Sequence, residues 1–126
     1  MCLNESDFEI SREILDEFVR VANEVVDAAG IVVKIFFRKP RSIQTFYKCD
    51  EDGCIVEQTT TTVLATEDAL IYVILQNFPD HLIFGEARGW FPEKRDADYV
   101  WVLDPIDGTT SFKNGFPLFD TLIALL

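Results

Sequence analysis

The feature that most constrains the fold is a short apolar run that ends in a carboxylate. Residues 99–103 are continuously apolar, which predicts a β-strand buried on both faces. Asp104 follows at once, and Pro105 cannot donate to a β-ladder, so we expect the strand to end there. A second carboxylate, Asp107, lies on the exit turn. Ligands of α/β sheets bind at the carboxyl ends of strands, so the pair predicts a ligand site.

Two carboxylates at one point repel each other unless a cation shares them. Oxygen-only ligation suits Mg²⁺, with Mn²⁺ as a second possibility. Zinc is not expected, because the chain has one His and three Cys at no zinc-finger spacing, and we expect all three thiols to be reduced. The alternative is a turn in which Asp104 and Asp107 cap their own backbone.

The residues after the second carboxylate suit an anion. Residues 108–111, Gly-Thr-Thr-Ser, offer free N–H groups and hydroxyls that could open a helix and hold a phosphate. Thr109 could orient a hydrolytic water, or it could be an ordinary turn threonine. Glu86 ends another predicted strand and could add a third oxygen ligand, or it could simply face water. His81 has no partner in the sequence, so we expect it at the surface, and Trp90 and Trp101 are expected to pack.

Apolar periodicity and turn signals predict an α/β protein with two helices. The expected elements are a long helix from a capping box at Ser6 and Glu9 to Arg38, a loop or poorly formed hairpin at 41–57, an extended segment at 58–64, a second helix from an N-cap at Thr66 to Phe78, strands at 81–86 and 121–126, and a polar loop at 89–98.

Composition excludes several classes of function. The 126 residues fit one domain or part of one, and 48% hydrophobic residues can form a core. With 22 Asp and Glu against 11 Lys and Arg, the net charge is −11, which argues against binding to nucleic acid or anionic membranes. No apolar run reaches the ~20 residues of a membrane span. The acidic start of the chain does not resemble a signal or transit peptide.

The segment 101–110, Trp-Val-Leu-Asp-Pro-Ile-Asp-Gly-Thr-Thr, resembles the signature of the inositol monophosphatase family. Members of this family are Mg²⁺-dependent, lithium-sensitive phosphatases of small phosphate monoesters. The resemblance covers most of the chain except residues 40–62. The segments most similar to the plant and bacterial histidinol-phosphate phosphatase branch are 37–39, 74–79, 85–86, 89–90, 111–112, 115, 117–119 and 121–126.

The resemblance implies a fold and a setting for this chain. The family fold is an αβαβα sandwich, of which residues 1–126 would be the N-terminal half, with a long first helix, a second helix and a mixed or antiparallel sheet. We therefore expect one phosphatase domain truncated at its C-terminus. Homodimerisation follows from the family, and a chloroplast location follows from the plant branch.

The resemblance also implies metal ligands. Glu86, Asp104 and the backbone carbonyl of Ile106 would hold a first Mg²⁺, and Asp104 and Asp107 would share a second. Glu86 and Thr109 would activate the attacking water.

The phosphate would be contacted by Ile106, Asp107, Gly108 and Thr109. The implied reaction is in-line attack of metal-activated water on a phosphate monoester, either histidinol phosphate in histidine biosynthesis or an inositol monophosphate.

The chain departs from the family pattern at several points. Val63 stands where the family has an Asp, and Ala87 replaces the second Glu of Gly-Glu-Glu. A later Trp-Asp motif and the residues that grip the substrate alcohol lie beyond Leu126. The alternative hypothesis is therefore a truncated, catalytically impaired member that binds metal weakly or pairs with a full-length relative. A strand at 121–126 would also leave an apolar edge that promotes aggregation.

Overall fold

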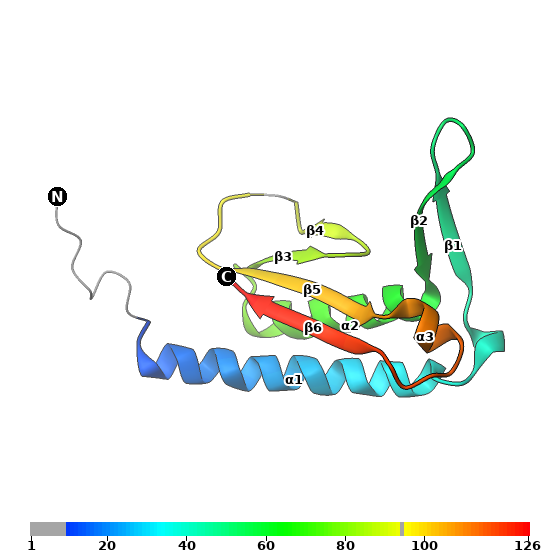
Figure 1. Cartoon of the computed structure of the whole chain (residues 1–126). Coiled ribbons are helices and arrows are strands. Elements are labelled where there is room, and N and C mark those ends of the chain that lie inside the picture. Colours follow the sequence, from blue (N-terminus) through cyan, green and yellow to red (C-terminus); the bar gives the residue numbers. More distant parts are fainter. Residues whose placement is uncertain (1–9, 94) are drawn as a thin grey trace.

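A computed structural model describes residues 10–93 and 95–126 of the chain (Figure 1). The elements in chain order are α1 (Arg12–Phe36), a short 3₁₀-helix η2 (Pro40–Ser42), β1 (Thr45–Cys49), β2 (Ile55–Thr60), α2 (Thr61–Asn77), β3 (Leu82–Gly85), β4 (Gly89–Phe91), β5 (Val100–Asp107), α3 (Thr109–Lys113) and β6 (Asp120–Leu125).

The strands form a mixed sheet and a separate hairpin. The sheet has the order β4-β3-β5-β6, in which β3 and β5 are parallel and the other pairs are antiparallel. Within the described residues, strands β1 and β2 form a two-stranded sheet of their own, and they project from one end of the helices (Figure 1). The predicted mixed α/β architecture is confirmed.

Helix α1 is the predicted long helix. It runs through Gly30 and ends at Phe36, ahead of Pro40. The Ser11 side chain caps it by accepting a hydrogen bond from the Ile14 N–H at 3.2 Å. The predicted capping box at Ser6 and Glu9 lies outside the described residues.

Helix α2 begins earlier than its sequence predicts. The N-cap is Thr60, whose hydroxyl accepts from the Val63 N–H at 3.3 Å, and Thr66 is buried inside the helix. The expected extended segment at 58–64 therefore ends at Thr60. The β-branched run favours a strand only weakly, and packing of the helix against α1 and the sheet overrides it.

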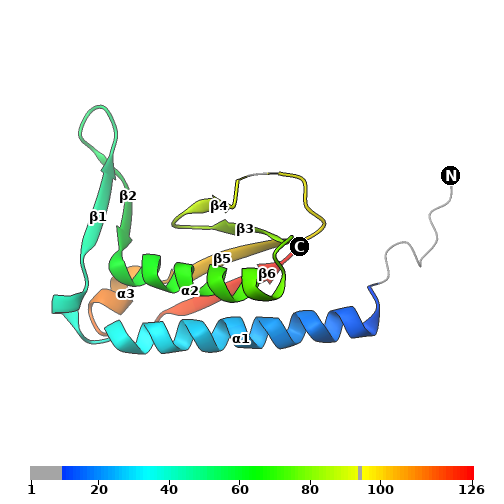
Figure 2. The same cartoon turned by 180° about the vertical axis from the view of Figure 1, so that it is seen from behind.

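Both long helices cover one face of the sheet (Figure 2). The apolar core is formed by Val21, Val25 and Ala29 from α1, Leu70, Ile71 and Ile74 from α2, and Ile83, Trp101 and Leu103 from the strands.

The opposite face of the sheet is open among the described residues. Phe84 is 39% exposed and Leu122 is 51% exposed, and both line a hollow of about 380 Å³. The prediction that the central strand is buried on both faces is therefore wrong. Trp101 and Leu103 are buried, whereas Val102 between them is half-buried. Within the described part of the chain, no helix is long and apolar enough to cross a membrane.

The segment 41–57, predicted as a loop or poorly formed hairpin, holds most of an antiparallel hairpin, whose register shifts after Lys48. The hairpin runs on to Thr60 and so includes the start of the segment predicted as extended. The expected polar loop at 89–98 begins with β4, which pairs with β3. Cys49 and Cys54 are free and exposed near the hairpin turn, and Cys2 lies outside the described residues.

His81 is half-buried and has partners within the fold, so the expectation that it lies at the surface is wrong. Its Nδ1 accepts a hydrogen bond from Trp101 Nε1 at 3.0 Å, and its ring stacks on Phe78 with centroids 4.3 Å apart. Burial lowers the pKa of His81, which keeps the imidazole neutral and able to accept this bond.

Candidate active site

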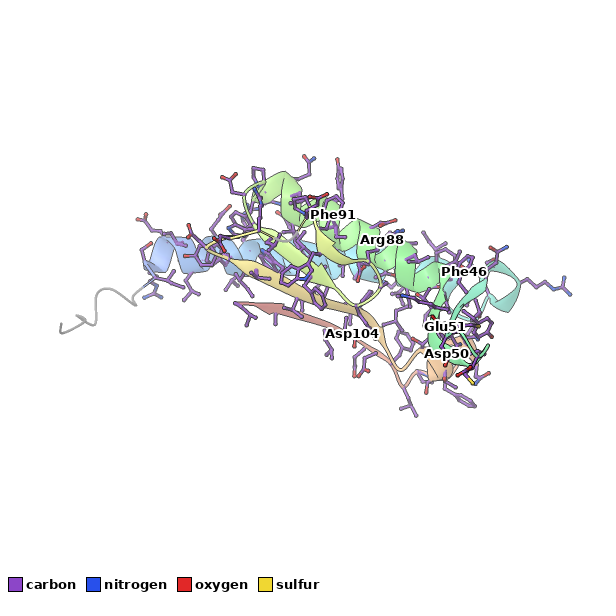
Figure 3. All side chains as sticks on the ribbon, turned by 90° about the horizontal axis from the view of Figure 1, so that it is seen from above. Phe46, Asp50, Glu51, Arg88, Phe91 and Asp104 are labelled. Carbon is purple, nitrogen blue, oxygen red and sulfur yellow. The ribbon has the colours of Figure 1, made fainter. Side chains whose placement is uncertain are left out.

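The parallel pairing of β3 and β5 brings Glu86 and Asp104 to the same edge of the sheet. Gly85 pairs with Leu103, and the Glu86 N–H donates to the Leu103 carbonyl at 3.0 Å. Glu86 comes directly after Gly85, and Asp104 comes directly after Leu103. The two carboxylates therefore lie side by side on neighbouring strands. Asp104 lies on the face of the sheet that no helix covers (Figure 3).

Glu86 and Asp104 line the same hollow on the open face of the sheet. A hydrogen bond to Asp104 raises the pKa of Glu86 to about 7, with further upward contributions from partial burial and from the charges of Asp104, Glu67 and Asp107. Among the described residues, Asp104 Oδ1 is buried and has no hydrogen-bond partner. Neither carboxyl group forms a salt bridge with any residue that the structure describes.

Strand β5 continues past Asp104 through a bulge. Its pairing with β6 is interrupted after Asp104 and resumes where Asp107 meets Asp120, so the expectation that Pro105 ends the strand is wrong. The bulge accommodates the missing N–H of proline. The Thr121 hydroxyl donates to the Pro105 carbonyl at 2.7 Å and ties the bulge to β6.

The segment after the bulge is sharply turned. Gly108 has a φ of 88°, and a Cβ there would lie 2.8 Å from the Leu118 carbonyl oxygen, so the position requires glycine. Helix α3 follows, with no side-chain hydrogen bond at its N-cap. The Thr109 hydroxyl donates to the Ile106 carbonyl at 3.3 Å.

A pocket of about 60 Å³ joins four parts of the chain and includes Glu86 in its lining. It is lined by Gln58 and Thr59 from β2, Val63 from α2, Glu86 and Ala87 from the turn after β3, and Thr109 from α3. Glu86 and Thr109, predicted together from the family resemblance, thus share one pocket. Val63 lines this pocket with an apolar side chain at the position where the family resemblance implies a carboxylate.

The donor set fits a hard divalent cation in its chemistry. The Glu86 and Asp104 carboxylates and the Ile106 carbonyl are oxygen donors, and the unpartnered Asp104 Oδ1 is the kind of atom that a cation would satisfy. In residues 10–93 and 95–126, however, no three His, Cys, Asp or Glu side chains form a metal-binding cluster. Asp107 is exposed. It affects Glu86 only through its charge.

Sequence reasoning missed Glu67. Its side chain is fully buried in α2 and accepts hydrogen bonds from the turn that carries Glu86. The signal was available, because Glu67 lies on the helical stripe formed by Val63, Leu70 and Ile74, where a carboxylate needs a reason to be present.

The fold and the site together define a layered α/β protein with two carboxylates side by side, one directly after β3 and one in the second half of the parallel strand β5. The chain belongs to the inositol monophosphatase family, because residues 14–126 match the sequence profile of that family.

Curated relatives include two chloroplastic proteins of Arabidopsis thaliana. Bifunctional phosphatase IMPL2 is 46% identical over 123 residues, which are 98% of this chain and 34% of IMPL2. Phosphatase IMPL1 is 40% identical over 107 residues, which are 82% of this chain and 27% of IMPL1. The chain thus spans about a third of the length of these relatives.

Solved structures agree with the fold. An inositol monophosphatase from Anabaena superimposes with a TM-score of 0.66 at 28% identity, over 89% of this chain and 36% of that chain. An inositol monophosphatase from Zymomonas mobilis gives a TM-score of 0.61 at 33% identity, over 93% of this chain and 40% of that chain. The mixed sheet with its two helices is therefore the part of the family fold that this chain shares.

Proposed function

We propose that this chain carries part of the active site of a phosphatase that hydrolyses phosphate monoesters of small molecules. The observation that carries the proposal is that Glu86 lines one hollow together with Asp104 and an adjoining pocket together with Thr109. Membership of the inositol monophosphatase family supports the same reaction class.

A divalent cation, Mg²⁺ or Mn²⁺, is the expected cofactor. Glu86, Asp104 and the Ile106 carbonyl would hold one ion, and Asp104 and Asp107 would hold a second. Bound there, the ions would neutralise the phosphate and act as Lewis acids.

The remaining roles belong to the side chains and backbone around the pocket. The Thr109 hydroxyl donates to the Ile106 carbonyl, which leaves its oxygen lone pairs free to accept from the attacking water. The Glu86 carboxylate receives the proton of that water as general base. Backbone N–H groups of residues 106–109 orient the phosphate for in-line attack.

The identity of the substrate is a more specific proposal, and it rests on the resemblance to the histidinol-phosphate phosphatase branch. The segments shared with the histidinol-phosphate phosphatase branch favour histidinol phosphate, with inositol monophosphate as the other candidate. The name of the Arabidopsis relative IMPL2, a bifunctional phosphatase, is compatible with either. A chloroplast location and a homodimer are proposed on the same basis.

Phosphate release tests the proposal. The chain is incubated with histidinol phosphate or inositol 1-phosphate and Mg²⁺, next to the variants Asp104→Asn and Asp96→Asn. Asp96 is exposed in the loop before β5 and is the matched control. We expect activity in the wild type and in Asp96→Asn, and a loss of at least ~100-fold in Asp104→Asn. Equal activity of the two variants would contradict the proposal.

Val63 favours a second candidate function, an impaired member that binds metal without catalysis. The pocket presents an apolar side chain where the family resemblance implies a carboxylate. This candidate predicts that Mg²⁺ raises the Tm of the wild type, that Asp104→Asn removes the effect, and that neither substrate releases phosphate.

A further inference from the structure

We propose that Glu67 is a positioning residue for Glu86: its buried carboxylate anchors the turn 86–88 and so fixes the Glu86 side chain beside Asp104. This inference rests on the proposed function only in the role that it gives to Glu86.

The anchor consists of two hydrogen bonds to consecutive backbone N–H groups. Glu67 Oε1 accepts from the Ala87 N–H at 3.1 Å, and Glu67 Oε2 accepts from the Arg88 N–H at 2.7 Å. The side chain is 0% exposed. A carboxylate that accepts one N–H on each oxygen restricts both the position and the orientation of the turn. The arrangement is similar to an anion bound by consecutive backbone N–H groups in a nest.

The last residue of β3, Gly85, lies directly against the Glu67 carboxylate. A Cβ on Gly85 would lie 2.3 Å from Glu67 Cδ and 2.3 Å from Oε1, so a side chain there would displace the Glu67 carboxylate. Gly85 has no positive φ, so glycine is favoured at this position by space and not by backbone conformation. The strand can approach the carboxylate closely only because Gly85 has no side chain, and Glu86 is the next residue.

A second contact holds the same turn from outside. Arg88 Nη2 donates to Asp68 Oδ2 at 2.9 Å, and both side chains are substantially exposed. Helix α2 therefore contacts the turn through two neighbouring carboxylates, one buried and one exposed. Because exposed ion pairs contribute little, we assign the anchoring to Glu67 and use Asp68 as the control.

The pKa of Glu67 is raised above its ordinary value. Burial is the main cause, and the hydrogen bonds from the Ala87 and Arg88 N–H groups and the charge of Arg88 oppose it. The charge of Glu67 also contributes to the raised pKa of Glu86.

The first test measures the anchor without any metal. Hydrogen exchange of the Ala87 and Arg88 amides is followed by NMR in the wild type, in Glu67→Gln and in Asp68→Asn, relative to the Leu70 amide. We expect protection in the wild type and in Asp68→Asn. In Glu67→Gln, an amide N–H₂ replaces one acceptor oxygen, so exchange at these two amides should rise roughly tenfold or more.

The second test measures Mg²⁺ binding by titration calorimetry. We expect the half-saturating Mg²⁺ concentration to rise roughly tenfold or more in Glu67→Gln and to stay unchanged in Asp68→Asn. A role in general stability alone would instead speed exchange at all core amides by one factor and leave Mg²⁺ affinity unaltered, and that result would overturn the inference.

The outcomes separate this inference from the proposed function. Unprotected Ala87 and Arg88 amides in the wild type would refute the anchor, whatever the metal does. Protected amides without Mg²⁺ binding would refute the proposed cofactor while the anchor stands. Should Glu67→Gln fail to fold, Gly85→Ala displaces the same carboxylate from the strand side and is expected to change the same two measurements.

Discussion

At the scale of single residues, the contact between Glu86 and Asp104 gives the metal-free chain an unusual response to pH. The pKa of Glu86 is about 7 in the folded chain, against an ordinary value of 4.5. The folded state therefore holds a proton that the unfolded state has already released. The stability from this proton is complete below about pH 4.5 and is lost as the pH rises through about 7.

We predict that the free energy of unfolding without Mg²⁺ falls between about pH 5 and about pH 8, and that Glu86→Gln reduces this fall. Urea unfolding at the two pH values measures it. His81 acts in the opposite direction, because its lowered pKa adds stability as the pH rises through 6.5, but it is present in both proteins and cancels in the comparison. Identical pH profiles for the two proteins would contradict the prediction.

The residues that were predictable from sequence are those whose signal is local. Asp104 and Glu86 each follow an apolar strand directly, so position along the chain was enough to single them out. Glu67 and His81 bond to residues that lie 20 or more positions away in sequence, and only the packing of α2 against β3 and β5 creates those partners. No local pattern could identify these contacts.

At the scale of elements, helix α2 is the layer that holds the sheet and the site together. Leu70 is fully buried between α1 and the strands, whereas Tyr72, on the same helix, is 66% exposed. The two positions separate the effect of core packing from that of helix formation.

We predict that Leu70→Ala lowers the free energy of unfolding by ~2–5 kcal/mol, because it leaves a cavity in the core. Tyr72→Ala should change it by less than ~0.5 kcal/mol, as expected for an exposed site. Urea unfolding of the three proteins under identical conditions provides the values. A similar loss in both variants would mean that the core is not packed as described.

The elements with strong periodicity were predicted well. Helix α1 follows from its apolar spacing and β3 from its short apolar run. The start of α2 was misplaced because four threonines in succession, residues 59–62, carry no periodic signal, and one of them, Thr60, is the cap. The β1–β2 hairpin was left open as an alternative because its strands show no clean alternation.

At the scale of the whole molecule, we expect the open face of the sheet to determine whether the chain self-associates in solution. Phe84, Val102 and Ala124 lie in one row across β3, β5 and β6, and Leu122 lies in the next. Strand β6 forms one edge of the described sheet. An apolar face beside an unpaired strand edge favours association.

We predict that the chain self-associates with increasing concentration and that Leu122→Lys weakens this association roughly tenfold or more, since it places a charge on the open face. Leu118→Lys is the control, because Leu118 is exposed in the loop before β6. Sedimentation velocity over a concentration series measures the effect. A monomer at all concentrations would contradict the prediction.

The two carboxylates of the candidate site lie next to the apolar open face of the sheet. Asp104 pairs directly with Leu122 on β6 and lies beside Glu86 on the turn after β3. If a cation binds the two carboxylates as proposed, a surface that covers Leu122 and excludes water from them would strengthen the binding of that cation. By reciprocity, the bound cation would favour the covering surface to the same degree. Covering the open face and binding a metal would then form one coupled equilibrium.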